Sequence, residues 1–249
     1  MVAVGSLTVV LVIVLFLVKP IFFPISDSWF QLSSKQLAAV PANVLVVRPT
    51  HFQDSLKKGI TYTPSGNVIR MEGRNVSLSD VISSAYQYRL PRIVLPADAP
   101  QCSFDFLVTV TNNPNEQLVA AIKKELGYSA HKETRPADVL LLKADTLNLS
   151  RLKPSPDDEK AGTRFQSGRL SYTHMPPGSV AGFLEWNLKK PVFDKTGITN
   201  VYDFNVNWDW HMDRGEFRVE DANKLLGGFG MHVEPGKESL EVLVVEKVK

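Results

Sequence analysis

Apolar and polar residues alternate in short runs along most of the chain, and these runs are separated by segments with helical spacing. Period-two alternation is typical of strands with one buried face, whereas apolar residues three and four positions apart indicate an amphipathic helix. In the first part of the chain, strands are expected at residues 43–47, 59–63, 67–71 and 103–110, followed by a closing hairpin at residues 128–133 and 139–143.

Two helices are predicted between these strands. Ser77 stands three residues before Asp80, which is the spacing of a capping box, and the apolar residues that follow lie on one helical face. The second helix is expected to begin at Asn113 and Pro114, which are favoured at the cap and at the first helical position. Gly127 is expected to end it, because glycine readily adopts the left-handed conformation of a C-terminal cap.

The same order of elements starts again after residues 151–162, a linker rich in proline, serine and charge. Gly168 stands 102 positions after Gly66 in an equivalent turn, and Gly230 stands 103 positions after Gly127 at an equivalent helix end. Shared turns, caps and apolar positions therefore predict two like units rather than one long irregular domain.

The fold class that this pattern predicts is α+β, with two tandem similar units that each combine a small, mostly antiparallel sheet with two helices. A hairpin is expected to close each unit, the second one at residues 231–245. The predicted organisation is a transmembrane anchor or signal at residues 1–25, a spacer at 26–42, the first unit at 43–150, the linker at 151–162 and the second unit at 163–249.

The N-terminal segment from Val2 to Val18 carries no charged residue. As a helix it would reach roughly 25 Å, slightly less than a typical hydrocarbon core. A cleaved signal peptide would carry basic residues before the apolar run and small residues at the cut, and this segment has neither. We therefore expect an uncleaved single-pass anchor, with the bulk of the chain in the periplasm or outside the cell.

Charge and cysteine content exclude several classes of protein. The chain has 28 Lys and Arg residues against 26 Asp and Glu residues, without a basic stripe, so nucleic acid is not an expected partner. Cys102 is the only cysteine, which excludes an intrachain disulfide and a cysteine-cluster metal site. No cofactor, metal ligand or catalytic residue is predicted.

Several motifs together carry a family pattern. In the second half, the residues are Pro191, Val192, Asp194, Thr196, Gly197, Ile198, Tyr202, Asp203 and Phe204, then Leu225, Gly230 and the terminal EVLVVEKV. In the first half, they are residues 75–86 (NVSLSDVISSAY), Phe104-Asp105 and residues 131–135 (HKETR). On these residues the chain, from about position 43 to its end, resembles a bacterial, soil-associated family of uncharacterised proteins with the motif PVxDxTGxxxxYDF. The chain departs from the family pattern in three places. Asn200 stands where the family has glycine, residues 90–100 replace a Gly-Pro-x-Trp step, and the family's Arg-Phe before the closing hairpin is absent around residues 125–127.

This resemblance implies an extracytoplasmic domain behind an N-terminal signal or anchor, and no known activity. In some relatives a similar domain follows a membrane metallopeptidase of the antibiotic-sensing type. The first helix is also similar to the short N-terminal domain of secretins and TonB-dependent receptors, which is a signalling or assembly module.

The motif segment supplies the candidate binding surface, which consists of Asp194, Lys195, Thr196, Tyr202 and Asp203. A phosphate-binding loop is an alternative for the turn that begins at Asp194, but the glycine run and the spacing of a P-loop are missing. The turn is therefore interpreted as structural.

A second candidate surface combines lysines with tryptophans near the motif. Its residues are Lys189, Lys190, Lys195, Trp186 and Trp208. Aromatic side chains beside cations are common on binding surfaces. The alternative is a solvated helix end with two indoles in the core.

Two sets of acidic residues have both a chemical and a structural interpretation. Asp105 and Asp203 occupy equivalent strand positions between aromatic residues, where they could act as a general acid and base. The alternation favours outward-facing carboxylates on strands whose aromatic residues face the core. Asp209, His211 and Asp213 would share one face of an extended segment as metal ligands, but a solvated loop is favoured.

These observations favour an extracytoplasmic binding or sensing module without catalytic activity. The expected partners are the membrane, through residues 1–25, and an unknown protein, peptide or envelope ligand. Two alternatives stay open, namely an extracytoplasmic hydrolase whose site is dispersed in sequence and a structural assembly module that resembles secretin-type N-terminal domains.

Overall fold

The computed structural model describes residues 27–30, 43–53, 57–62, 68–110, 112–145, 148, 151–156, 158, 160–166, 169–207 and 217–248. The chain divides into a unit of residues 1–42 and a unit of residues 43–249. In the first unit, the short 3-10 helix η1 (Asp27–Phe30) is described, whereas the predicted anchor at residues 1–25 lies outside the described residues. No helix of the described ranges is both long and apolar enough to cross a membrane.

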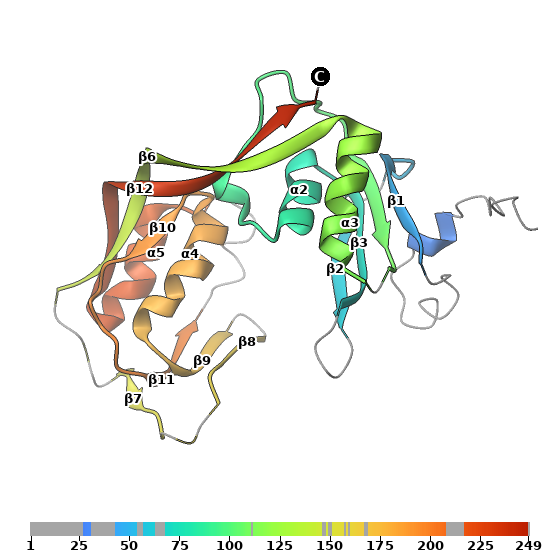
Figure 1. Cartoon of the computed structure of the whole chain (residues 1–249). Coiled ribbons are helices and arrows are strands. Elements are labelled where there is room, and N and C mark those ends of the chain that lie inside the picture. The colour runs from blue at the N-terminus through green and yellow to red at the C-terminus, as the bar shows by residue number, and fades with distance from the viewer. Residues whose placement is uncertain are drawn as a thin grey trace, which may run out of the picture. The chain divides into compact units, whose positions relative to one another are not determined.

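The second unit begins with a four-stranded antiparallel sheet of order β1-β5-β3-β2. Its strands are β1 (Leu45–Pro49), β2 (Lys57–Tyr62), β3 (Val68–Val76) and β5 (Phe104–Val108). Helix α2 (Leu78–Tyr86) and helix α3 (Pro114–Ala121), which continues into the π-helical turn η4 (Ile122–Leu126), lie against this sheet (Figure 1). The predicted capping box of α2 is confirmed, since Ser77 and Asp80 each bond the main-chain N–H of the other.

A second antiparallel sheet has the order β7-β11-β9-β8. Its strands are β7 (Lys153–Pro154), β8 (Gly162–Gln166), β9 (Arg169–Met175) and β11 (Tyr202–Asn207). The accompanying helices are η6 (Pro177–Val180), α4 (Ala181–Leu188), α5 (Val219–Leu226) and η8 (Gly227–Phe229). The α+β class is therefore confirmed, and β7 lies within the segment predicted as a linker.

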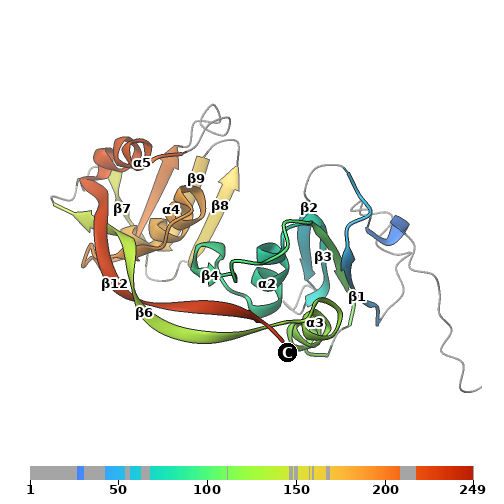
Figure 2. The same cartoon turned by 90° about the horizontal axis from the view of Figure 1, so that it is seen from above.

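The third sheet, of order β10-β6-β12-β4, is built on two long strands, β6 (Tyr128–Ala144) and β12 (Met231–Lys247). These two strands pair antiparallel along all 17 residues of each. The short strands β4 (Ile93–Val94) and β10 (Val192–Asp194) pair parallel with β12 and β6, respectively. Figure 2 shows the β6–β12 ribbon running past the helices of both halves of the chain.

The predicted closing hairpins at residues 128–143 and 231–245 are wrong, because each segment is one continuous strand. The N–H of Leu140 points toward β10 and donates to Pro191 O at 2.9 Å. Leu140 and Pro235, which lie opposite each other, therefore form a non-hydrogen-bonded pair of the β6–β12 ladder. Pro136 lies four residues before Leu140 and therefore has the same orientation. Both prolines point their nitrogens away from the ladder, where the missing N–H has no cost.

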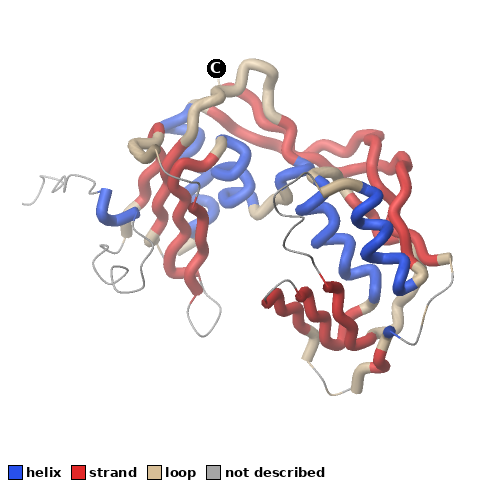
Figure 3. Tube along the Cα trace, turned by 180° about the vertical axis from the view of Figure 1, so that it is seen from behind, coloured by secondary structure: helices blue, strands red, loops and turns tan. Residues whose placement is uncertain are grey.

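Two buried hydrophobic clusters fill the second unit, and each is completed by a strand from the other half of the chain. Leu243 and Val245 of β12 pack into the cluster of α2, α3, β3 and β5. Leu140 and Leu142 of β6 pack into the cluster of α4, α5, β9 and β11. In Figure 3 the helices of each half are seen against their strands. The ribbon thus ties the two clusters together.

Candidate functional site

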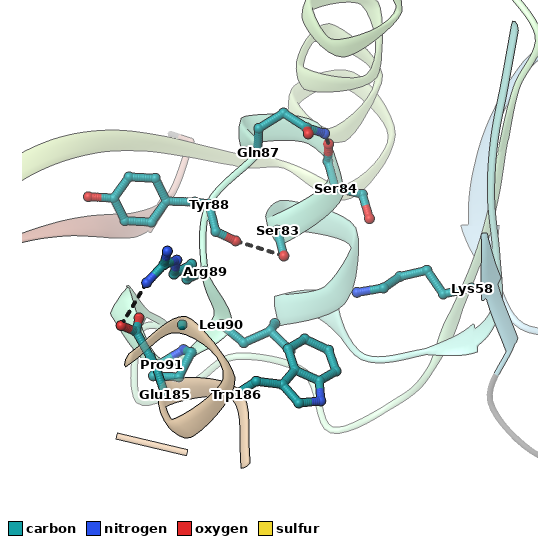
Figure 4. Close-up of a pocket in the computed structure, with 11 residues that line it drawn as sticks. Lys58, Ser83, Ser84, Gln87, Tyr88, Arg89, Leu90, Pro91, Glu185 and Trp186 are labelled. Carbon is teal, nitrogen blue, oxygen red and sulfur yellow. Dashed lines mark hydrogen bonds and ion pairs between the residues drawn. The ribbon is translucent and has the colours of Figure 1, made fainter. Parts of the chain in front are cut away.

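A pocket of about 640 Å³ lies between the C-terminal end of α2 and helix α4. Figure 4 shows the side chains around it, which come from β2, α2, the turn at residues 87–89, η3 (Leu90–Arg92) and α4. Lys58, Gln87, Arg89, Leu90, Glu185 and Trp186 are among the residues that line it. The pocket therefore collects residues from both halves of the chain.

The end of α2 turns the chain toward α4. Gln87 takes a left-handed conformation with φ 52°, and its side chain donates to Ser84 O at 2.7 Å. Ser83 Oγ donates to Tyr88 O at 2.7 Å, which closes the turn. Pro91 then favours the single 3-10 turn of η3 that carries Arg92. As a result, two arginines project from one short segment toward α4.

Glu185 of α4 is the acceptor for both arginines, although only 1% of its surface is exposed. Arg92 binds it with both ends of its guanidinium fork, Nε to Oε1 at 2.7 Å and Nη2 to Oε2 at 2.8 Å. Arg89 Nη1 adds a bond to Oε2 at 3.0 Å, and the Val192 N–H adds another at 3.3 Å. Burial alone would raise the pKa of Glu185, but these donors hold it below its ordinary value.

Trp186, the next residue of α4, is 52% exposed. Lys189 Nζ lies 4.8 Å and Lys58 Nζ lies 6.0 Å from its ring centroid. Lys58 Nζ is also 3.0 Å from Asp80 Oδ1. A large aromatic surface beside cations at the mouth of a pocket is a typical place for a ligand to bind.

The predicted binding surface at residues 194–203 is distributed over two sheets, and none of its five residues lines the pocket. Asp194 Oδ1 accepts from Thr196 N at 2.9 Å and from Thr196 Oγ1 at 2.7 Å, as expected for a structural turn. Lys195 Nζ pairs with Glu238 Oε1 at 2.6 Å. Tyr202 packs against the second hydrophobic cluster from β11.

The predicted outward orientation of Asp105 is wrong, since its surface is 0% exposed. Its carboxylate accepts from Thr50 Oγ1 at 2.7 Å and from the Asn75 N–H at 3.1 Å. Asn75 lies at an irregularity of β3 and has φ 54°, so the buried carboxylate satisfies a main-chain donor that the ladder does not use. Asp203 accepts from the N–H of His174, which has φ 50°, at 2.9 Å. Both aspartates therefore stabilise strand irregularities at residues with positive φ.

The second predicted surface is partly assembled. Trp186 and Lys189 lie together, and the exposure of Trp186 contradicts its placement in the core. Lys190 is exposed in the turn that follows α4, and Lys195 is paired with Glu238. The other tryptophan of this surface, Trp208, lies outside the described residues, as does the candidate metal segment at residues 209–213.

Arg89, Arg92 and Glu185 were not predicted from the sequence. One signal was present, because Glu185 stands four residues after Ala181 and one after Leu184, among apolar positions of the same helix. A charge on the buried face of a helix requires a partner, but the partner's place in the chain cannot be derived from that spacing. Within the described ranges, no group of three or more His, Cys, Asp or Glu residues could hold a metal ion.

Comparison with known proteins gives one match. Residues 79–248 match the model of a family described as "Protein of unknown function (DUF3738)". The chain matches no curated protein and no solved structure. The matched segment contains the end of α2, η3 and α4, so it includes the pocket residues named above except Lys58.

Proposed function

The chain belongs to the DUF3738 family of proteins of unknown function, and on that premise we propose that it is a membrane-anchored extracytoplasmic module that binds a ligand without transforming it. The binding site is the pocket between α2 and α4. The observation that carries the proposal is the half-exposed indole of Trp186, which stands beside two lysines at this pocket.

The size and wall of the pocket support this proposal. Its volume of about 640 Å³ falls within the range of small-molecule sites, roughly 300–1,000 Å³. The Glu185 carboxylate and two arginines fix the position of α4 against η3, so the wall that carries Trp186 is held in place before a ligand arrives. Preorganisation of this kind lowers the entropic cost of binding.

The arrangement of the sheets supports a tandem duplication, which is part of the same proposal. In both β1-β5-β3-β2 and β7-β11-β9-β8, the first strand in sequence lies at one edge, next to the last strand, and the second strand lies at the other edge, next to the third. In the third sheet, β10-β6-β12-β4, each half of the chain contributes one long central strand and one short edge strand. The short strands β4 and β10 each pair parallel with the long strand of the other half. In a duplicated chain α2 and α4 are equivalent helices, so the pocket lies where the two copies meet.

The membrane anchor of the proposal is supported by the uncharged run from Val2 to Val18. Cell fractionation, followed by protease treatment of intact and of permeabilised cells, tests the anchor and the side of the membrane. The proposal expects the chain in the membrane fraction. A periplasmic domain would be digested after the outer membrane is permeabilised, and an extracellular domain would be digested in intact cells. A chain released without detergent would contradict the anchor.

The binding function is tested by screening the full chain against neutral and charged small molecules, including sugars, amino acids and cell-envelope fragments, by ligand-observed NMR. Trp186→Ala is expected to abolish binding of the hits. Phe165→Ala is the matched control, because Phe165 is 50% exposed on β8 and does not line the pocket. Hits that survive Trp186→Ala, or chemical turnover of a hit, would contradict the proposal.

A further inference from the structure

We propose that the ligand of the α2–α4 pocket is a small organic anion that carries an aromatic ring. Its carboxylate is bound by Arg89, its ring lies against Trp186, and Lys58 adds a positive charge near that ring. This inference rests on the proposed binding function and adds the chemical class of the ligand.

Charge at the pocket supports an anion. Four cations, Lys58, Arg89, Arg92 and Lys189, stand at or beside it. Among the described residues, two carboxylates, those of Asp80 and Glu185, are paired with them. The difference leaves a positive balance of two charges in a concave and partly desolvated place, where an electrostatic attraction is screened less than on an open surface.

Arg89 is the group best suited to hold the carboxylate. Arg92 already occupies both oxygens of Glu185, so the further bond from Arg89 is an addition to a satisfied pair. Its side chain is 58% exposed, and Nη1 is the one donor that is engaged in the part of the chain that the structure describes. The remaining edge of the guanidinium presents a fork of N–H groups, the geometry that carboxylates bind best.

Gly182 keeps the surface of α4 open beside this fork. A Cβ at residue 182 would lie 3.6 Å from Arg89 Nη2 and would be in contact with it. Lys58 approaches from β2 with a compact charge that has three donors, and its Nζ lies 3.0 Å from Asp80 Oδ1. Lys58 therefore adds positive charge beside the Trp186 ring, and Arg89 supplies the donors for the carboxylate.

The apolar part of the pocket explains why a ring is required in addition to a charge. Trp186 offers an aromatic surface that is half exposed, and Leu90 and Pro91 of η3 extend the apolar wall. An inorganic anion would leave this wall exposed to water. A neutral sugar could stack on the indole, but it would leave the cations without a counter-charge.

Matched acid and amide pairs test the inference on the full chain. Phenylacetate, 1-naphthoate and indole-3-carboxylate are each compared with the corresponding neutral amide, and acetate serves as an anion without a ring. Saturation-transfer NMR detects binding, and titration gives the dissociation constants. At least one aromatic acid is expected to bind about tenfold more tightly than its amide and than acetate, because charge-assisted hydrogen bonds are lost in the amide and ring contacts in acetate.

One variant and its matched control test where the carboxylate of the ligand binds. Arg89→Gln is expected to weaken binding of the acid about tenfold and to leave binding of the amide unchanged, while the Arg92–Glu185 pair keeps the fold intact. Arg164→Gln is the control, because Arg164 is exposed on β8 and does not line the pocket.

The outcomes separate this inference from the proposed function. If amides bind as tightly as acids, or if neutral molecules of the wider screen bind through Trp186 and the acids do not, the anionic class is overturned and the binding function stands. If no molecule of either set binds, both are overturned.

Discussion

Pro136 of β6 lies directly opposite Ser239 of β12, and it stands 103 positions before it. The same interval separates Gly127 from Gly230, the two glycines that precede these strands with φ 73°. The ladder between the two strands is therefore symmetric about this pair, with Tyr128 opposite Lys247 at one end and Ala144 opposite Met231 at the other. The C-terminal part of each half's last strand packs into the hydrophobic cluster of the other half.

This symmetry makes a prediction about the first half alone. Residues 43–150, expressed without the second half, lack the β12 strand that completes their cluster. We expect them to form a dimer in which two copies of β6 pair about Pro136, since a copy of β6 can take the place of β12. Light scattering after size-exclusion chromatography measures the mass, and a stable folded monomer would contradict the exchange.

Glu185 is predicted to be a major contributor to stability. Glu185→Gln removes a buried charge that Arg92 binds with both ends of its guanidinium fork, so we expect a loss of roughly 3 kcal/mol in the free energy of unfolding. Urea denaturation of the full chain measures the loss. Glu234→Gln is the control, because Glu234 pairs with Lys143 at a solvent-accessible position and its loss should cost much less than the loss of Glu185. Equal losses in the free energy of unfolding would show that the buried Glu185 pairs contribute no more to stability than the exposed Glu234 pair.

The same carboxylate predicts how stability depends on pH. Burial raises the pKa of Glu185, but the bonds from Arg92, Val192 and Arg89 outweigh it, so the pKa in the folded protein lies below 4.5. The stabilising contribution is therefore fully present above pH 4.5 and is lost as the pH falls through the lowered pKa. The difference in stability between the native chain and Glu185→Gln should stay constant from pH 7 to about 5 and shrink below that. A difference that grows in acid would contradict this assignment.

The two strand aspartates are predicted to be structural and unequal. Asp105→Ala removes the buried acceptor of Thr50, His51 and Asn75, which should cost roughly 2–4 kcal/mol. Asp203→Ala, at a half-buried position, should cost roughly 1 kcal/mol. Thermal unfolding of both variants measures the difference. If neither variant loses stability, the carboxylates do not stabilise the strand irregularities at Asn75 and His174.

Features that depend on a few neighbouring residues could be predicted from the sequence. The capping box of Ser77 and Asp80 and the helix ends at Gly127 and Gly230 are of this kind, because both partners lie within one turn of chain. The α+β class follows from the alternation of such segments.

Features that depend on distant partners could not be predicted. The Arg-Pro-Ala-Asp segment at residues 135–138 has the composition of a turn, and only its pairing with β12 makes it a strand. The binding of Arg89 and Arg92 to Glu185 joins positions more than ninety residues apart. Lys189 beside Trp186 was within reach of sequence reasoning, because the two residues are three positions apart at the end of one helix.

Hydrogen–deuterium exchange of the full chain, with and without the tightest ligand of the screens, tests the binding site most directly. The account predicts slower exchange at residues 83–92 and 181–189, which form the two walls of the pocket, and no change in β8. Protection confined to residues 194–203, the surface that the sequence alone favoured, would contradict it.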